Sequence, residues 1–201
     1  ILTPSGNSLL GSISKDGKRL VYMSTRGEMI LSKVPFDAAN AMVRGKPTQI
    51  WTSSTFVFNN KPVHSPDGQW IAASNSNNTS RVQGDLFVMR NDGSGFRKLT
   101  DDSAEDIMLQ WSSDGKKLVF LSNRNNQGYQ VWVIHPDGSG LEQLTKLRSR
   151  PSTAFLLPGG ETLSLVLDPE GTCLMDLTRP LDEREPKPLP PFDSVGYRFR
   201  A

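Results

Sequence analysis

The sequence has 201 residues, of which 36% are hydrophobic and 22% are charged, and its formal net charge is +2. This composition is that of a globular chain long enough to bury a core, and it excludes a disordered polyelectrolyte. The basic residues are scattered, and the apolar runs are far shorter than the roughly 20 residues of a membrane helix. We therefore expect no nucleic-acid surface and no membrane segment in this sequence.

Four short segments repeat one pattern along the chain, a Gly-containing turn followed by an apolar alternation. They are SKDGKRLVYMS from Ser14, SPDGQWIAAS from Ser65, SSDGKKLVFLS from Ser112 and the degenerate LPGGETLSLVL from Leu157. Aligned on the turn glycines Gly17, Gly68, Gly115 and Gly160, the copies are 51, 47 and 45 residues apart. Asp-Gly favours a tight turn, because Gly adopts positive φ freely and Asp hydrogen-bonds its own backbone. A period in the forties is typical of β-propeller blades.

Further β-type runs complete each unit. The innermost strand precedes the turn, as in FVF (56–58) and IMLQW (107–111). Third strands are expected at residues 28–34, 85–90, 129–134 and 172–177. The nearly identical segments 90–100 and 135–145 add a second turn, Asp-Gly-Ser-Gly, and a fourth strand. One four-stranded sheet cannot bury both of its faces alone, so we predict an all-β propeller of four-stranded antiparallel blades stacked around an axis.

The repeat also sets the expected division of the chain. We place the blades at residues 6–52, 53–100, 101–145 and 146–190, and we take 191–201 as the first strand of a further blade. About four blades are therefore present, as an arc of a larger ring unless the last strand completes the first blade. The sequence begins at Ile1 rather than Met, so we expect a processed protein or a fragment of a longer one.

Three local expectations accompany this division. The Pro-rich segment 179–192 is either a domain linker or, as we prefer, the outer edge strand of the fourth blade with a long connection. One helical turn is expected at 37–40. In the third blade we expect alternate members of one apolar set to be buried between adjacent sheets. This set comprises Trp111, Leu118, Phe120, Val131, Trp132 and Val133.

The order of these motifs resembles a known repeat. The pattern S-P-D-G-x-x-[IL]-A, then S-N-R, a strand and D-G-S-G-x-x-x-L-T, is similar to the WD-like repeat of TolB-type β-propellers. The match is strong over residues 65–145, recognisable over 12–52 and weak over 153–190, where Gly159–Gly160 replaces Asp-Gly. The resemblance implies a ring of six to eight blades in full-length relatives and a binding scaffold. It also suggests a bacterial protein in a periplasmic or extracytoplasmic location.

The residues themselves indicate no catalytic or metal site. There is no Gly-x-Ser-x-Gly motif, and His64 and His135 lie at turns, where we expect a backbone partner. The acidic run 101–106 lacks the ligand spacing of a Ca²⁺ loop and is expected to be solvated. Cys173, the single cysteine, excludes an internal disulfide and is expected to be an inert core thiol. We therefore expect a chain that is not an enzyme and has no cofactor.

The most function-like feature is a set of loops at one end of the predicted propeller. We call this the loop end; it gathers the loops between blades and the loops from second to third strands. The opposite, turn end carries the repeated Ser-x-Asp-Gly and Asp-Gly-Ser-Gly turns, whose composition backbone geometry already explains. Loops on a rigid scaffold often carry binding. The loop-end binding candidates are Arg26, Asn77, Arg81, Asp101, Asp102, Asn123, Arg124, Arg148 and Arg150. Arg26 and Arg124 recur at matching positions of their blades, which favours a structural role for these two residues.

Three functions remain open from the sequence. The first is a recognition or sensor module for a protein, peptide or small ligand, like the extracytoplasmic portions of bacterial Ser/Thr kinases and transcriptional regulators that the repeat resembles. The second is the propeller gate of a prolyl-oligopeptidase-type serine peptidase, whose catalytic domain would be outside these residues. The third is a structural repeat with no ligand of its own. We favour the first, with a protein or peptide partner.

Overall fold

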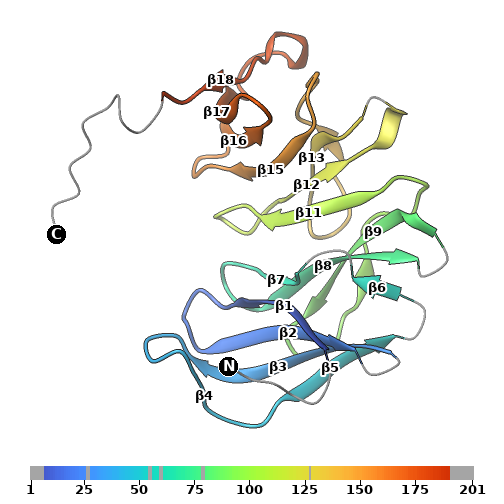
Figure 1. Ribbon diagram of the computed structural model, residues 1–201, viewed down its shortest axis with the longest axis vertical. Helices are drawn as coiled ribbons and strands as arrows, with labels where there is room; N and C mark the ends of the chain where they lie inside the picture. Colours follow the sequence, from blue (N-terminus) through green and yellow to red (C-terminus); the bar gives the residue numbers. More distant parts are fainter. Residues whose placement is uncertain are drawn as a thin grey trace, which may run out of the picture.

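The computed structural model describes the backbone of residues 7–25, 28–53, 56–58, 61–77, 80–126 and 128–190. These residues form four antiparallel sheets that succeed one another along the long axis of the molecule (Figure 1). We call the sheets blades 1 to 4 in chain order. The helical segments of the described residues are two single 3-10 turns, η1 (Arg124–Asn126) and η2 (Leu181–Glu183). The prediction of an all-β, partial β-propeller is confirmed. The strand expected at 191–201 lies outside the described residues.

Blades 1 and 2 each carry one short strand beyond the basic four. The strands of blade 1 are β1 (Asn7–Ile13), β2 (Arg19–Thr25), β3 (Met29–Asp37), β4 (Met42–Val43) and β5 (Thr48–Ser53). The strands of blade 2 are β6 (Phe56–Phe58), β7 (Val63–His64), β8 (Trp70–Asn77), β9 (Ser80–Arg90) and β10 (Arg97–Lys98). Both β4 and β5 pair with β3, whereas β6 and β7 both pair with β8, so the innermost strand of blade 2 is broken in two.

Blades 3 and 4 each contain four strands in simple sequential order. The strands of blade 3 are β11 (Asp106–Trp111), β12 (Leu118–Ser122), β13 (Gln130–Ile134) and β14 (Glu142–Gln143). The strands of blade 4 are β15 (Pro151–Leu156), β16 (Thr162–Leu167), β17 (Gly171–Asp176) and β18 (Lys187–Pro188). The last of these is the edge strand expected within the Pro-rich segment, and it pairs with β17.

The helical turn expected at 37–40 does not form. The Asp37 carboxylate instead accepts hydrogen bonds from the backbone N–H of Asn40, at 3.2 Å, and from its side-chain amide, at 2.9 Å. The same carboxylate binds the Arg44 guanidinium at 2.6 Å. These contacts close a tight turn after β3, and β4 then pairs back with the end of that strand. Local side-chain hydrogen bonds of Asp thus compete successfully with the helix.

The Ser-x-Asp-Gly turns are held by one repeated set of contacts. In blade 3 the Ser112 hydroxyl donates to Asp114 at 2.7 Å and accepts from the Lys117 backbone N–H at 2.9 Å. The Gly115 N–H donates to the Ser112 carbonyl at 2.9 Å, and Gly115 adopts a φ of 72°. Ser14 and Ser65 make the equivalent contacts. The turn residues named from the sequence are therefore those that make the turn.

Three apolar clusters lie between successive blades and form the core. Their buried members include Phe87 between blades 1 and 2, Phe120 between blades 2 and 3, and Leu165 between blades 3 and 4. All five residues of β12 and all five of β13 are buried. The expectation that only alternate members would be buried is wrong for these strands, because blade 2 covers one face of blade 3 and blade 4 covers the other.

Candidate functional site

The structure describes only some of the loop-end candidates in full. Arg26 lies outside the described residues. For Asn77, the last residue of β8, and for Arg81, in β9, the backbone is described but the side chains are not. The remaining six candidates have described side chains. They divide into residues that stabilise the loops of blade 3 and residues that face solvent near blade 4.

Arg124 belongs to the first group, since its side chain is only 9% exposed. One of its terminal nitrogens donates to both oxygens of Asp106, at 2.9 and 2.8 Å, and its Nε donates to the Ser122 hydroxyl at 2.8 Å. The guanidinium carbon also lies 5.0 Å from the centre of the Trp132 ring. Burial raises the pKa of the Asp106 carboxyl, and the Arg124 charge opposes this. Arg124 is thus held in a buried ion pair with Asp106 that ties η1 to the start of β11.

Asp101, Asp102 and Asn123 lie in the same part of the molecule. Asp101 pairs with Lys98, whose ammonium also lies 3.0 Å from Asp85. The Asp102 carboxylate accepts from the Ala104 backbone N–H at 2.8 Å, and Asn123 accepts from the Glu105 N–H at the same distance. These contacts order the loop that enters blade 3. The expectation of a solvated acidic run holds for the exposed Asp101 and Asp102 but is wrong for Asp106, which is fully buried and paired with Arg124.

Arg148 and Arg150 form the second group, and both are exposed, as expected. The guanidinium carbon of Arg150 lies 4.2 Å from the centre of the Tyr129 ring. Tyr129 itself donates a hydrogen bond to Glu105, and burial together with Glu105 raises its pKa to about 12. The ring is thus fixed, and it orients Arg150 while leaving the guanidinium N–H groups without a hydrogen bond to the described residues.

A cavity of about 530 Å³ lies beside Arg150, between blades 3 and 4 at the loop end. Its lining is Ile107, Met108, Leu121, Ser149, Arg150, Pro151, Ser152 and Asp168. Met108 has a φ of 56°, which is unusual for a residue with a side chain. It lies in a β-bulge of β11, and its side chain is 41% exposed. Bulges redirect side chains next to functional sites, and here the bulge places an apolar side chain at the cavity wall.

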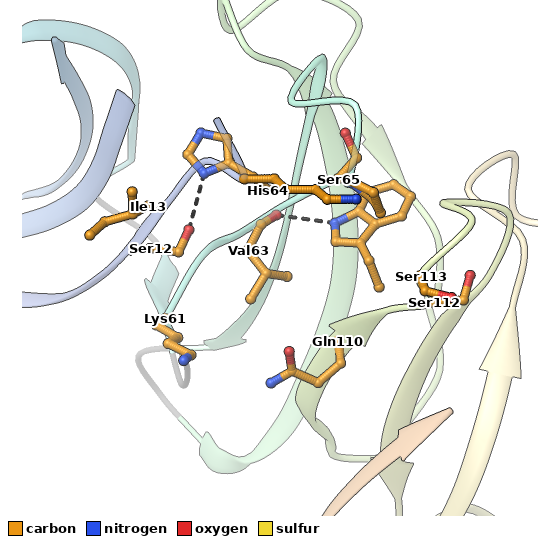
Figure 2. A pocket seen from close by; sticks show the side chains of 12 residues that line it. Ser12, Ile13, Lys61, Val63, His64, Ser65, Gln110, Ser112 and Ser113 are labelled. Atoms are coloured by element: carbon orange, nitrogen blue, oxygen red, sulfur yellow. Dashed lines mark hydrogen bonds between the residues drawn. The ribbon is translucent and has the colours of Figure 1, made fainter. Parts of the chain in front are cut away.

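A second cavity, of about 410 Å³, opens at the turn end, where the innermost strands of blades 1, 2 and 3 finish (Figure 2). Its lining is Ser12, Ile13, Lys15, Lys61, Val63, His64, Ser65, Pro66, Gln110, Trp111, Ser112 and Ser113. We call it the turn-end pocket. The indole N–H of Trp111 donates to the Val63 carbonyl at 3.1 Å, which holds strands β7 and β11 together at the pocket wall.

His64 has a side-chain partner rather than the expected backbone partner. Its Nδ1 lies 3.2 Å from the Ser12 hydroxyl, across blades 1 and 2 (Figure 2). Its Nε2 is buried and has no hydrogen-bond partner among the described residues. Burial, and then the charge of Arg19, lower the pKa of His64 to about 4, so the imidazole is neutral near pH 7. The residue before the turn is Ile13 in blade 1 and Trp111 in blade 3. The polar His64 at this otherwise apolar position of blade 2 is the feature by which the sequence could have indicated the pocket.

The remaining histidine and the cysteine do not form a further site with the described residues around them. His135 contacts the hydroxyl of Ser139 at 3.0 Å within an exposed turn. Cys173 is fully buried, and burial raises the pKa of its thiol. No three His, Cys, Asp or Glu side chains among the described residues lie together as metal ligands would. Among the same residues, no helix is long and apolar enough to cross a membrane.

Comparison with known proteins identifies the repeat. The profile of the TolB beta propeller domain family matches residues 1–182. Dipeptidyl-peptidase 5 of Porphyromonas endodontalis is 32% identical over 88 residues, which are 41% of this chain and 12% of that protein. An uncharacterised protein of Agrobacterium fabrum is 32% identical over 142 residues, which are 67% of this chain and 45% of that protein. The chain spans less than half the length of either relative.

Solved structures share the fold at low sequence identity. TolB from Acinetobacter baumannii superposes with a TM-score of 0.66 at 18% identity, covering 92% of this chain and 44% of that one. An oligogalacturonate lyase in complex with manganese superposes with a TM-score of 0.71 at 14% identity, covering 88% of this chain and 52% of that one. A puromycin-hydrolyzing peptidase of Mycobacterium tuberculosis reaches 0.64 at 11% identity, covering 92% and 29%. These likenesses concern the fold alone.

Proposed function

Because the chain belongs to the TolB β-propeller domain family, we propose that it is a non-catalytic binding module that recognises a protein or peptide at its loop end. The observation that carries the proposal is the 530 Å³ cavity between blades 3 and 4. Its volume lies within the range of ligand sites, and it combines an apolar floor with a few polar groups at the rim, as such sites do. The arc of stacked blades supplies a rigid support for these loops.

The chemistry of the rim indicates an acidic partner. Arg150 lines the cavity together with one carboxylate, that of Asp168, and is oriented by the Tyr129 ring. Arg148 lies two residues earlier, and neither arginine makes an ion pair with the described residues. Arginine offers five N–H donors in a fixed geometry that suits carboxylates. The neighbouring Met108 offers an apolar contact. An acidic side chain next to an apolar one, within an extended peptide, satisfies both groups.

The proposal is tested by selecting peptides from a displayed random library on the immobilised protein. We expect the selected peptides to be rich in Asp and Glu, and to lose binding to an Arg148→Glu/Arg150→Glu variant. The matched control is Lys18→Glu/Lys116→Glu, which makes the same change of net charge at the turn end. Peptides that bind the loop-end variant as well as the unchanged protein, or that lose binding only to the control, would overturn the assignment.

A second candidate function has its own support. Dipeptidyl-peptidase 5 is a curated relative, and a peptidase is among the structures that share the fold. In this alternative the propeller is the gate of a prolyl-oligopeptidase-type serine peptidase. A serine hydrolase domain encoded in the same reading frame would establish it. Under either function we expect the purified chain to hydrolyse neither peptide nor ester substrates; activity that disappears in a His64→Gln or His135→Gln variant would contradict this.

A further inference from the structure

The turn-end pocket contains polar side chains that the fold does not use. Lys15 and Lys61 are exposed, Gln110 is half-buried and Ser113 is exposed, and all four line the pocket. None of the four makes a hydrogen bond or an ion pair with the described residues. This contrasts with Ser65 and Ser112 beside them, whose hydroxyls are occupied within their own turns. Four unused groups converging on one cavity are better suited to a ligand than to the stability of the fold.

The charges around this pocket favour an anion. Its lining has two ammonium groups and no carboxylate. The nearest turn carboxylates, those of Asp16, Asp67 and Asp114, accept hydrogen bonds from their own turn serines and from backbone N–H groups, which lower the pKa of each. These carboxylates are thus ionised and keep their negative charge, but none of them lines the pocket. Lys15 and Lys61 do line it and make no ion pair with the described residues, so the charged groups that a ligand in the pocket would contact are positive.

The walls of the pocket are apolar between these groups. Val63 is buried at the base, Trp111 is half-buried, and Ile13 is 47% exposed. Because the indole N–H of Trp111 is satisfied by the Val63 carbonyl, the ring is held in place and offers its carbon surface. Figure 2 shows Lys61 and Gln110 on one side of Val63 and the His64 ring on the other. A ligand that fits both features carries an anionic group on an apolar body.

We propose that the turn-end pocket binds an organic carboxylate, with Lys15 and Lys61 holding the anionic group and Trp111 and Ile13 contacting the apolar body. A single negative charge fits better than a phosphate dianion, for two reasons. The pocket lining has no guanidinium to receive a phosphate in bidentate fashion. The carboxylate of Asp16, next to Lys15 in the chain, would repel a second negative charge. This site is separate from the loop end, at the opposite end of the innermost strands.

The test uses phenylacetate as the probe and phenylacetamide as its uncharged counterpart. Binding is followed by nuclear magnetic resonance, through the shift of the Trp111 indole N–H, which a Trp111→Phe variant identifies. We expect phenylacetate to shift this signal and phenylacetamide to leave it in place. Addition of salt should weaken the binding, because exposed charge pairs are screened. A second pair of probes, N-acetyl-Gly-Phe with a free carboxylate and with an amidated end, distinguishes a free acid from the end of a peptide.

Two double variants complete the experiment. Lys15→Met/Lys61→Met should weaken phenylacetate binding about tenfold or more, because both ammonium contacts are lost. Lys18→Met/Lys116→Met removes the same net charge from neighbouring turn positions outside the pocket lining and should leave binding within about twofold. Equal binding of acid and amide, equal weakening by the two double variants, or no shift with any probe would each overturn the proposal. Because none of these changes touches the loop end, the outcome does not depend on the proposed function.

Discussion

Blades 3 and 4 arise from the same repeat, yet they bury their side chains differently. All five residues of β12 in blade 3 are buried, whereas β16 in blade 4 alternates between buried and half-buried residues. Blade 3 is packed between two other blades, while among the described residues blade 4 packs against blade 3 alone. The same strand pattern is therefore fully or half covered according to its neighbours, which is the behaviour of a stacked repeat.

The two blades also differ in what holds them internally. Asp106 and Ser122 pair across β11 and β12, and 45 residues later Pro151 and Leu167 occupy the same positions in blade 4. Both first turns are closed by a backbone bond, from the Gly115 N–H to the Ser112 carbonyl in blade 3 and from the Gly160 N–H to the Leu157 carbonyl in blade 4, but only blade 3 adds the side-chain bonds of Ser112. At these positions blade 3 thus has polar side-chain contacts that blade 4 does without.

The largest expected effect on stability comes from removing one phenylalanine side chain from each blade. Phe120 in blade 3 is fully buried, and Phe155 in blade 4 is 45% exposed. Phe120→Ala should lower the free energy of unfolding by about 3–5 kcal/mol, because a cavity remains. Phe155→Ala should cost less than about 1 kcal/mol. Urea unfolding of both variants measures the difference, and equal costs would show that the burial of the two blades is not as described.

A second test concerns the buried ion pair that blade 4 lacks. Asp106→Asn should lower the free energy of unfolding by about 3 kcal/mol, because the charge of Arg124 loses its partner. The cost falls at the low end for a buried pair, since Asp102 lies 3.5 Å from the same guanidinium. The double variant Asp106→Leu/Arg124→Met should be more stable than Asp106→Asn. A loss below about 1 kcal/mol for Asp106→Asn would mean that the pair contributes little.

The third test extends the comparison to the residue before the turn, which is His64 in blade 2 and Trp111 in blade 3. The pKa of His64 falls from 6.5 to about 4 on folding, because of burial and the Arg19 charge. A lowered pKa means that the unfolded chain binds the proton more tightly, so this contribution is complete above about pH 6.5 and is lost as the pH falls towards 4. The loss should reach about 2–3 kcal/mol near pH 4.

His64→Gln separates this effect from the titration of the carboxyl groups. Unfolding free energies of the unchanged protein and the variant are compared at about pH 7 and about pH 4. The unchanged protein should lose more stability than the variant over this interval. If both lose the same amount, the imidazole is solvated in the folded state and the pocket is more open than the structure indicates.

The smallest expected effect concerns the turns. Ser112→Ala should cost about 1 kcal/mol, because the hydroxyl both donates to Asp114 and accepts from the Lys117 N–H. Ser113→Ala is the control, since this exposed neighbour makes no such contact, and it should change stability by less than about 0.5 kcal/mol. Thermal unfolding of the two variants makes the measurement. Equal stability of both variants would show that backbone bonds suffice in blade 3, as they do in blade 4.

Much of the fold could be predicted from the sequence because its information is local. Gly115 and Asp114 specify a turn through their own backbone preferences, and a Gly-containing turn recurs in each blade at spacings of 45 to 51 residues. The alternation of apolar residues likewise marked the strands, and β11 (Asp106–Trp111) begins one residue before the expected range 107–111. These features depend on residues a few positions apart, so no knowledge of the ring was needed.

The sites depended on contacts between distant segments. Arg124 was grouped with exposed loop arginines, but the fold brings it to Asp106, 18 residues earlier, and buries the pair. His64 reaches Ser12 in another blade, 52 residues away, and the turn-end pocket exists only because three innermost strands end side by side. The sequence by itself determined turns, strands and their period, since each follows from backbone chemistry within a few residues. Only the tertiary structure decided which faces are covered and which polar groups meet, because packing of one blade against the next sets both.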